Sequence, residues 1–349
     1  MWRFCLFLLL VLTPEENKVA KQIFAFGQCL DESGNAVDFF YGYKLPKIRD
    51  HLEGYELFYI TSDRVELGWK KSLLSLKSQD NLVARTLGVP MSRDTHLLLA
   101  YNDEEPNGGK DDIGGHAKGV LATDGIKGFW LVHSAPKFPD ITNYHYPENA
   151  VRNGQSFLCI SIKASEIEKI GSQFLFNEVN IYDSKIPDNL KGRFKNIEDA
   201  IGKKWRNEGP FQNLQEIQSS NGTTFLSFAK GRNFKKELYV DWVAPQLGVD
   251  LLTETWQNGP GALPSNCSMK NKVFNVKEVQ FQNQQISFHS TVDHSKWAVG
   301  EEEPWICVGD INRAEHQEMR GGGTVCLKNE KLAGLYRKLV ENYQKCEEF

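Results

Sequence analysis

This 349-residue chain contains one short motif twice, once in each half of its length. A His-Ala-Lys triplet stands at 116–118, and an apolar run ends in His133 seventeen residues after its histidine. A His-Ser-Lys triplet stands at 294–296, and the polar residue Asn312 follows its histidine by eighteen residues, beyond a second apolar run. A motif that recurs together with its downstream spacing indicates one structural unit used twice.

The repeat predicts a mixed α/β fold of two similar halves, residues 21–200 and 201–349, with one triplet in each. Short apolar or alternating runs bounded by glycine and polar clusters predict strands, and apolar residues at helical spacing predict helices. The expected strands are 95–101, 128–133, 156–163, 224–229, 285–289 and 305–308, and the expected helices are 62–77, 165–176, 197–207 and 332–346.

Residues 1–20 have the layout of a secretory signal peptide, with one arginine before a nine-residue apolar run and a polar segment after it. A membrane-spanning helix needs ~20 apolar residues, so this run is too short to be an anchor. We expect cleavage between residues 13 and 25. No second apolar run of spanning length follows. We therefore expect a secreted or lysosomal protein that does not span a membrane.

The cysteine count agrees with export. Of seven cysteines, Cys5 leaves with the signal peptide, and an even number remains. Six cysteines in an exported protein predict up to three disulfides, with fifteen possible pairings. No Cys-x-x-Cys pair occurs, so a structural zinc site is not expected. Glycosylation acceptor tripeptides begin at Asn221 and Asn266.

The net charge indicates the pH at which an anionic substrate would bind better, but not what the protein does. Forty-one basic and 45 acidic residues give a net charge of −4, so no basic excess indicates nucleic-acid binding at neutral pH. Protonation of the eight histidines would reverse that sign. An anionic substrate would thus be held better in an acidic compartment. The apolar fraction of 40% is that of an ordinary globular protein and excludes a disordered chain.

The chemistry of two His-x-Lys triplets suits a phosphodiester. Residues i and i+2 of a strand face the same side, so each histidine would point with its lysine. One imidazole can attack phosphorus and form a phosphohistidine, and the other can protonate the leaving alkoxide. The two lysines would neutralise the phosphate oxygens, so neither a metal ion nor another cofactor is expected. Neighbouring lysines lower an imidazole pKa and a phosphate raises it, which favours an optimum below neutral pH.

Simpler interpretations exist for each residue. His116 lies among glycines and suits a loop with a local hydrogen bond. His133 ends an apolar strand, as buried core histidines often do. His294 follows an aspartate and suits a plain ion pair, and each lysine taken singly suits the surface. The glycine run 321–323 is either a phosphate-binding loop or a turn.

The runs around these residues form a wider pattern. They are 37–40 (VDFF), 43–46 (YKLP), 115–120 (GHAKGV), 128–134 (GFWLVHS), 293–297 (DHSKW), 307–313 (CVGDINR) and 320–326 (RGGGTVC). In these runs, which follow in order over most of the chain, the sequence resembles the deoxyribonuclease II family of acid endonucleases.

The resemblance implies a phospholipase D-like fold, in which two α/β halves related by a pseudo-twofold axis share an active site at their junction. It implies endonucleolytic cleavage of DNA at acid pH without a divalent metal, leaving 3′-phosphate and 5′-hydroxyl ends. It implies disulfides Cys29–Cys159, Cys267–Cys346 and Cys307–Cys326.

The resemblance also implies roles for individual residues. His116 and Lys118 would form one half of the catalytic site, His294 and Lys296 the other, and His133 would be a third important histidine. We favour His116 as the nucleophile and His294 as the acid. For substrate binding, Asn312 fits the trailing polar position, and Trp297 is either a base-stacking residue or a core tryptophan that closes a strand.

Two rival functions stay open. The first is a phosphodiesterase of the same fold that acts on a lipid headgroup. The second is a secreted nuclease-fold protein that binds DNA or host partners without catalysis. The sequence leaves the oligomeric state open, a homodimer included.

Overall fold

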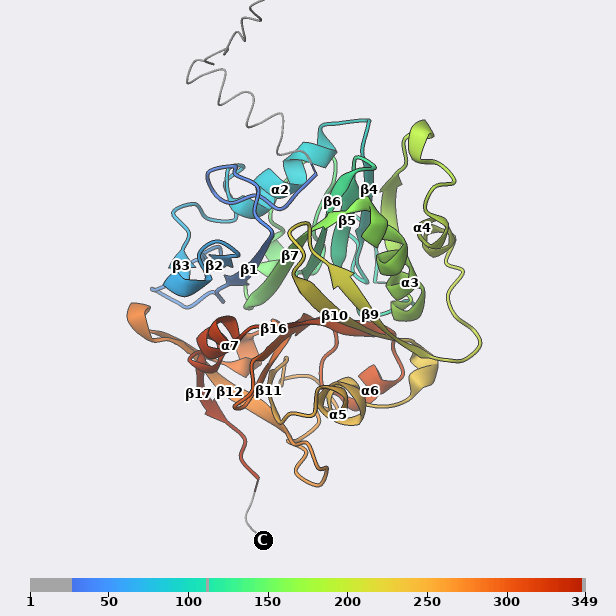
Figure 1. Cartoon of the computed structure of the whole chain (residues 1–349). Coiled ribbons are helices and arrows are strands. Elements are labelled where there is room, and N and C mark those ends of the chain that lie inside the picture. The colour runs from blue at the N-terminus through green and yellow to red at the C-terminus, as the bar shows by residue number, and fades with distance from the viewer. Residues whose placement is uncertain (1–26, 111–112, 347–349) are drawn as a thin grey trace, which may run out of the picture.

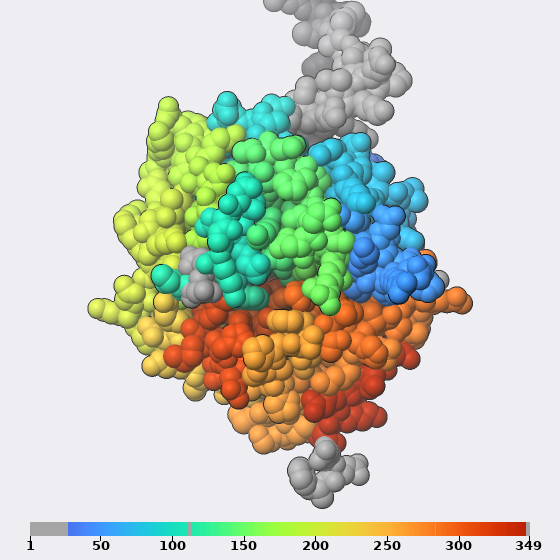
Figure 2. Space-filling model, turned by 180° about the vertical axis from the view of Figure 1, so that it is seen from behind, coloured from blue at the N-terminus to red at the C-terminus, as the bar shows by residue number. Residues whose placement is uncertain are grey.

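The computed structural model describes residues 27–110 and 113–346. The expected signal peptide at 1–20 lies outside these ranges. The described residues form two β-sheets, one above the other in Figure 1. This confirms the mixed α/β class. Seen from behind, the earlier residues in blue to green and the later residues in orange to red meet across the middle of the molecule (Figure 2).

The first sheet has the order β3-β2-β1-β7-β6-β5-β4-β8. Its strands are β1 (Phe39–Lys44), β2 (Leu57–Thr61), β3 (Lys70–Lys71), β4 (Leu97–Tyr101), β5 (Gly119–Thr123), β6 (Lys127–His133), β7 (Gln155–Lys163) and β8 (Ile181–Lys185).

The second sheet has the order β13-β12-β11-β14-β15-β16-β10-β9, with β17 paired to β12. Its strands are β9 (Gln212–Gln218), β10 (Thr224–Lys230), β11 (Leu251–Glu254), β12 (Val273–Phe281), β13 (Ile286–His289), β14 (Trp297–Gly300), β15 (Trp305–Gly309), β16 (Gly322–Lys328) and β17 (Val340–Tyr343).

Five strands of each sheet follow the same order. They are β1-β7-β6-β5-β4 in the first sheet and β10-β16-β15-β14-β11 in the second, and every neighbouring pair is antiparallel. Lys118 directly precedes β5, and Lys296 directly precedes β14. The two triplets therefore occupy equivalent positions in the two sheets.

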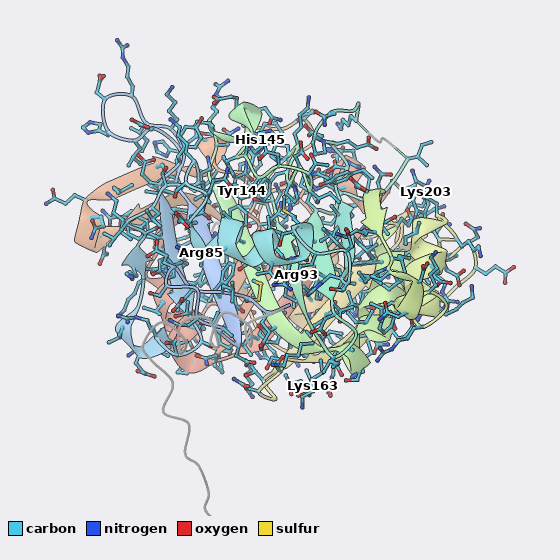
Figure 3. All side chains as sticks on the ribbon, turned by 90° about the horizontal axis from the view of Figure 1, so that it is seen from above. Arg85, Arg93, Tyr144, His145, Lys163 and Lys203 are labelled. Atoms are coloured by element: carbon cyan, nitrogen blue, oxygen red, sulfur yellow. A yellow bond between two sulfur atoms is a disulfide. The ribbon has the colours of Figure 1, made fainter. Side chains whose placement is uncertain are left out.

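The helices cover and join the sheets. The α-helices are α2 (Leu82–Met91), α3 (Ile167–Asn177), α4 (Lys195–Ile201), α5 (Ala244–Leu247), α6 (Glu315–Glu318) and α7 (Glu330–Arg337). Helix α2 begins at Asn81, whose side chain accepts hydrogen bonds from two backbone N–H groups of its first turn. It covers the outer face of the first sheet, and its residue Arg85 is labelled in Figure 3.

The main core lies between the sheets. Inward side chains of both sheets pack there with α3, through Phe174, and with α7, through Tyr336. Both residues are fully buried. A separate core forms where α5 and the preceding turn cover the outer face of the second sheet. Because the central core draws on both sheets, each half supports the other.

The strand predictions are confirmed, and so is the helix at 165–176. The helix predicted at 197–207 ends early, at Ile201. The helix predicted at 62–77 is wrong: that stretch contains a 3₁₀ turn at Val65–Leu67, then Gly68 at φ 78°, then β3. The helix predicted at 332–346 ends at Arg337, because the following residues pair with the edge of β12 as β17. A tertiary contact there overrides the helical spacing.

Three disulfides join Cys29 to Cys159, Cys267 to Cys346 and Cys307 to Cys326, the pairs that the family resemblance implies. The first links the residues before β1 to the middle of β7, and the third links β15 to β16. Among the described residues, no helix is long and apolar enough to cross a bilayer.

Candidate active site

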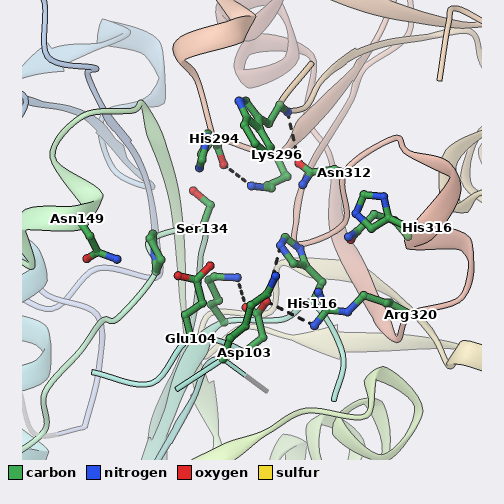
Figure 4. A pocket seen from close by; sticks show the side chains of 15 residues that line it. Asp103, Glu104, His116, Ser134, Asn149, His294, Lys296, Asn312, His316 and Arg320 are labelled. Carbon is green, nitrogen blue, oxygen red and sulfur yellow. Dashed lines mark hydrogen bonds and ion pairs between the residues drawn. The ribbon is translucent and has the colours of Figure 1, made fainter. Parts of the chain in front are cut away.

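A cavity of about 390 Å³ lies where the two sheets meet. It is lined by both triplets and by side chains from both halves of the chain (Figure 4). The lining residues are Asp103, Glu104, Lys110, His116, Lys118, Ser134, Pro136, Asn149, Trp256, His294, Lys296, Asn312, His316, Gln317 and Arg320. Two imidazoles and two ammonium groups, far apart in sequence, thus border one space.

His116 is held by the opposite half of the molecule. Its backbone N–H donates to the carbonyl oxygen of Gly321 at 2.8 Å. Its ring Nδ1 lies 2.6 Å from the carbonyl oxygen of Asp310. A carbonyl only accepts, so Nδ1 carries the hydrogen in this contact. In the neutral ring, Nε2 then holds the lone pair.

The Asp103 carboxylate lies next to two cationic side chains and one imidazole of the cavity. It pairs with the Lys118 ammonium, lies 3.4 Å from the Arg320 guanidinium and 3.9 Å from Nε2 of His116. Burial alone would raise the pKa of Asp103, but these three neighbours hold it below its ordinary value. Asp103 therefore stays charged and compensates the charges of Lys118 and Arg320.

His294 is the counterpart in the second half. Its backbone N–H donates to the carbonyl oxygen of Gly154 at 2.9 Å. Its own carbonyl accepts from the Lys296 ammonium at 2.6 Å. Its ring lies against the indole of Trp256, with centroids 4.6 Å apart. His294 thus faces an aromatic ring where His116 faces a carboxylate.

Burial and neighbouring cations lower the pKa of both histidines. For His116, burial and Lys118 lower the pKa well below its usual value, although Asp103 opposes them. For His294, burial, then Lys296 and Lys118, lower the pKa to about 3. The His294 ring is therefore neutral at pH 5, and the shift of the His116 pKa also favours the neutral ring. A phosphate anion beside them would raise both pKa values.

Lys296, which lines the cavity, and Asp310, whose carboxyl accepts from the Lys118 backbone beside it, also have shifted pKa values. Burial and the neighbouring Lys118 lower the pKa of Lys296 to about 7. Burial raises the pKa of Asp310 to about 7, against the opposing effect of Lys118. The Asp310 carboxyl is thus protonated at pH 5 and partly ionised at neutral pH. The cavity therefore gains positive charge on acidification.

Comparison with known proteins shows what the chain is related to. The sequence profile of the deoxyribonuclease II family matches residues 28–346.

The chain belongs to the deoxyribonuclease II family.

Relatives with curated names match over nearly their whole length. Plancitoxin-1 of Acanthaster planci is 40% identical over 335 residues, 91% of this chain and 92% of the relative. Deoxyribonuclease-2-alpha of Mus musculus is 37% identical, over 91% of this chain and 93% of the relative. Deoxyribonuclease-2-beta of Homo sapiens is 36% identical, over 91% of both chains. At the level of the family, these matches confirm the expected enzyme class, a deoxyribonuclease II-type hydrolase.

Two of the expected site residues of this deoxyribonuclease II family member lie outside the cavity. His133 is fully buried, with its ring between Phe138 and Phe157, and its backbone N–H donates to the Lys118 carbonyl at 3.1 Å. Burial, with Lys118, lowers its pKa to about 3. His133 is therefore a neutral core residue behind the first triplet and does not line the cavity.

Trp297 is also a core residue. It is 0% exposed, and its indole N–H donates to the Tyr43 hydroxyl at 3.3 Å. A base cannot stack on a ring that is fully buried, so the interpretation as a core tryptophan is the correct one, although Trp297 begins β14 rather than closing a strand. The tryptophan that lines the cavity is Trp256.

Asn312 lines the cavity, but not as the structural counterpart of His133. Strand β15 ends at Gly309, three residues before Asn312. The Gly309 N–H donates to the Lys296 carbonyl, as the His133 N–H does to that of Lys118. The matching position is therefore Gly309, and the similar sequence spacing was misleading. The Asn312 side chain accepts from the Trp256 backbone at 3.3 Å.

Strand register explains the residues that sequence reasoning missed. Tyr101 pairs with Gly119 at the start of β5, and Glu254 pairs with Trp297 at the start of β14. Two residues after each of these positions stand Asp103 and Trp256. Asp103 and Trp256 thus occupy equivalent positions, but one carries a carboxylate and the other an indole. No motif marks either one, since the likeness lies in pairing rather than residue type.

The glycine run 321–323 is neither a phosphate loop nor a turn. A Cβ on Gly323 would lie 2.0 Å from the Phe228 carbonyl oxygen, and one on Gly321 would lie 2.3 Å from that of Asn177. Gly322 begins β16. The run lets backbones approach closely enough for Gly321 to accept from His116.

The remaining predicted sites lie at the periphery. Asn221 is exposed in the turn between β9 and β10, and Asn266 is half-buried in the segment before β12. Among the described residues, no group of three or more His, Cys, Asp or Glu side chains is arranged to hold a metal ion.

Proposed function

We propose that this protein is an acid endodeoxyribonuclease that hydrolyses DNA without a metal ion, through a phosphohistidine on His116. The observation that carries the proposal is the single cavity that both His-x-Lys triplets line. Family membership supports DNA as the substrate, since relatives carry the name deoxyribonuclease.

In the first step, the Nε2 lone pair of His116 attacks phosphorus. A phosphorus–nitrogen bond forms, and the bond between phosphorus and the 5′-oxygen breaks. His294, protonated when the DNA phosphate is bound, gives its proton to that leaving oxygen and frees a 5′-hydroxyl end. The hydrogen bond from Nδ1 of His116 to the Asp310 carbonyl supports this assignment, because it leaves Nε2 with the lone pair.

In the second step, water resolves the intermediate. His294, now neutral, removes a proton from the water, and the water oxygen attacks phosphorus. The phosphorus–nitrogen bond breaks, and the product leaves with a 3′-phosphate. His116 returns to its neutral form. The net reaction consumes one water for each phosphodiester cleaved.

Cationic side chains supply the charge stabilisation. Lys118, Lys296 and Arg320 line the cavity and would surround the non-bridging phosphate oxygens. This cluster supports metal independence, because it provides the positive charge that the transition state needs. Protonation of Asp310 below its pKa of about 7 adds to that charge and supports an acid optimum.

We also propose the wider architecture and setting that the sequence suggested. The matching order of five strands in each sheet supports a pseudo-twofold, phospholipase D-like arrangement of halves 21–200 and 201–349. The disulfides support passage through the secretory pathway, to a lysosome or the outside of the cell. Asn221 and Asn266 are the proposed glycosylation sites. The sequence leaves the oligomeric state open, with a homodimer as one option, and sedimentation velocity would distinguish a monomer from a homodimer.

The test uses supercoiled plasmid in EDTA at pH 5 and pH 7.5. The wild type should nick the plasmid at pH 5, and His116→Ala and His294→Ala should each lose on the order of 10³-fold in rate. End-labelling of the products should find 3′-phosphates. A folded wild type that cuts only when Mg²⁺ replaces EDTA would overturn metal independence.

The alternative is a secreted protein that binds DNA or host partners without cutting. It predicts no nicking by folded wild type under either condition, together with retention on immobilised DNA at pH 5. A parallel assay on phosphatidylcholine vesicles tests the lipid phosphodiesterase. The complete set of two histidines and two lysines in one cavity favours catalysis over binding alone. Membership of the deoxyribonuclease II family favours DNA over a lipid as the substrate.

A further inference from the structure

Two buried lysines outside the cavity make unusual contacts with the backbone. Lys44 and Lys230 are each 0% exposed. The Lys230 ammonium donates to three carbonyl oxygens, those of Gln317 at 3.0 Å, Glu318 at 3.1 Å and Arg320 at 2.6 Å. The Lys44 ammonium donates to two carbonyl oxygens, that of Val151 at 2.8 Å and that of Asn153. Each ammonium thus binds the backbone carbonyl oxygens of one loop.

The two lysines are structural equivalents. Lys44 is the last residue of β1 and pairs with Gln155 at the start of β7. Lys230 is the last residue of β10 and pairs with Gly322 at the start of β16. Strands β1 and β7 correspond to β10 and β16 in the matching strand order. Each lysine therefore holds the loop that leads into the strand beside its own.

Each anchored loop ends at a carbonyl that holds a cavity histidine. Arg320, bound by Lys230, directly precedes Gly321, whose carbonyl accepts from the His116 N–H. Asn153, bound by Lys44, directly precedes Gly154, whose carbonyl accepts from the His294 N–H. The contacts are crossed, because each lysine lies in the half opposite to the histidine that its loop contacts.

We propose that Lys44 and Lys230 are positioning residues for the two histidines, Lys44 for His294 and Lys230 for His116, each acting across the interface between the halves. The proposal deepens the function proposed above and rests on it for its catalytic consequences. The structural part, which lysine holds which histidine, stands on the hydrogen bonds alone.

The charge states fit this role. Burial lowers the pKa of Lys44 to about 7, while Asp293 and Glu56 oppose the shift. Burial lowers the pKa of Lys230 to about 8, while Glu237, Glu178 and Glu318 oppose the shift. Because both pKa values lie above 5, both lysines are charged at pH 5. An ammonium has three hydrogens to donate, which equals the number of carbonyls around Lys230.

The first test measures amide hydrogen exchange by mass spectrometry at pH 5. Lys230→Met should speed exchange in the segment 114–119 by ~10-fold and leave the segment 292–297 unchanged. Lys44→Met should do the reverse. Lys163→Met is the matched control, because Lys163 is exposed at the far end of β7 and lies at the periphery in Figure 3. Equal acceleration of both segments in either variant, as general loosening would produce, overturns the proposal.

Buried substitutions can prevent folding, so a second pair of variants covers that outcome. Lys44→Gln and Lys230→Gln keep an amide donor on a shorter side chain. We expect them to show the same crossed pattern with smaller acceleration. If they fold and leave both segments as protected as in the wild type, the proposal is wrong.

The second test separates the two catalytic roles with thymidine 3′-(4-nitrophenyl phosphate), whose leaving group needs no acid. Lys44→Met should keep the first-turnover burst of nitrophenolate on this substrate while losing plasmid cleavage. Lys230→Met should lose both. A folded wild type that releases no nitrophenolate from this substrate would contradict the proposed attack by His116 but leave the exchange result standing, so the two failures are distinguishable.

Discussion

The backbone N–H of His116 donates a 2.8 Å hydrogen bond to the carbonyl oxygen of Gly321. The first histidine is therefore held in place by the residue that directly precedes β16 of the second sheet. In the equivalent contact of the other half, the backbone N–H of His294 donates to the carbonyl oxygen of Gly154. Neither half of the molecule builds its own part of the site alone, so separation of the halves should abolish activity even if each half folds.

Replacing Asp103 with Asn removes the charge that compensates Lys118 and Arg320. We expect the free energy of unfolding to fall by on the order of 3 kcal/mol at pH 7, because the cations lose a buried partner. The pKa of Asp103 lies below its usual 3.8, so this stabilisation is present above that pH and declines as pH falls further. Urea unfolding at pH 7 and pH 3 checks this. A difference between the proteins that grows toward acid pH contradicts it.

Replacing Asp310 with Asn should extend activity toward neutral pH. The carboxyl has its pKa raised to about 7, so wild type gains a negative charge in the cavity as pH rises from 5 to 7.5. The Asn variant does not. We expect the ratio of kcat/KM at pH 7.5 to that at pH 5 to rise roughly tenfold, the effect of ~1.4 kcal/mol of electrostatic free energy. Asp183→Asn, at an exposed position of β8, should leave the ratio unchanged.

Replacing Trp256 with Leu should weaken binding of single-stranded oligonucleotides at pH 5. The indole lines the cavity beside His294, where it can stack on an unpaired base. Loss of one stacking contact costs ~1–3 kcal/mol of binding free energy. Fluorescence anisotropy measures the Kd. Trp305→Leu, at the opposite end of β15 from the cavity, should bind normally, and equal losses in the two variants would argue against stacking.

Replacing Glu254 with Gln should make stability less dependent on pH. Within the described part of the chain, both carboxylate oxygens of Glu254 are buried without a hydrogen-bond partner. Burial and the nearby Asp293 raise its pKa well above 4.5. The folded state thus keeps a proton that the unfolded state releases, so wild type loses stability as pH rises above ~4.3. Thermal unfolding at pH 4.5 and 7.5 should show a smaller decrease in Tm for the variant than for wild type.

Much of the site was predictable from sequence because its signal is local. The prediction that each triplet lies on a strand was wrong, because the triplets end directly before β5 and β14. Their recurrence with similar downstream spacing nevertheless located both histidines and both lysines of the cavity. Apolar periodicity located β4, β6 and β7. The same local reasoning failed where a distant segment intervened, as at 332–346, where pairing with β12 replaced the second half of a helix.

Register was the other source of error. Spacing along the chain suggested that Asn312 corresponds to His133, but backbone pairing assigns that position to Gly309. A loop can lengthen without changing the sheet, so a residue count does not preserve register. Asp103 and Trp256 were missed because their equivalence lies in strand pairing, and no residue motif marks either position.

Residue types and their local period were enough to find the histidines and lysines of the triplets, to recognise the family and to predict two similar halves. Contacts across the fold were needed to show which imidazole nitrogen carries the hydrogen, which histidine has a carboxylate neighbour, and that the buried Lys44 and Lys230 bind the loops that hold the histidines of the opposite halves. Those properties depend on hydrogen bonds and charges between residues far apart in the chain. Folding alone brings such groups within a few ångströms, where their interactions become strong.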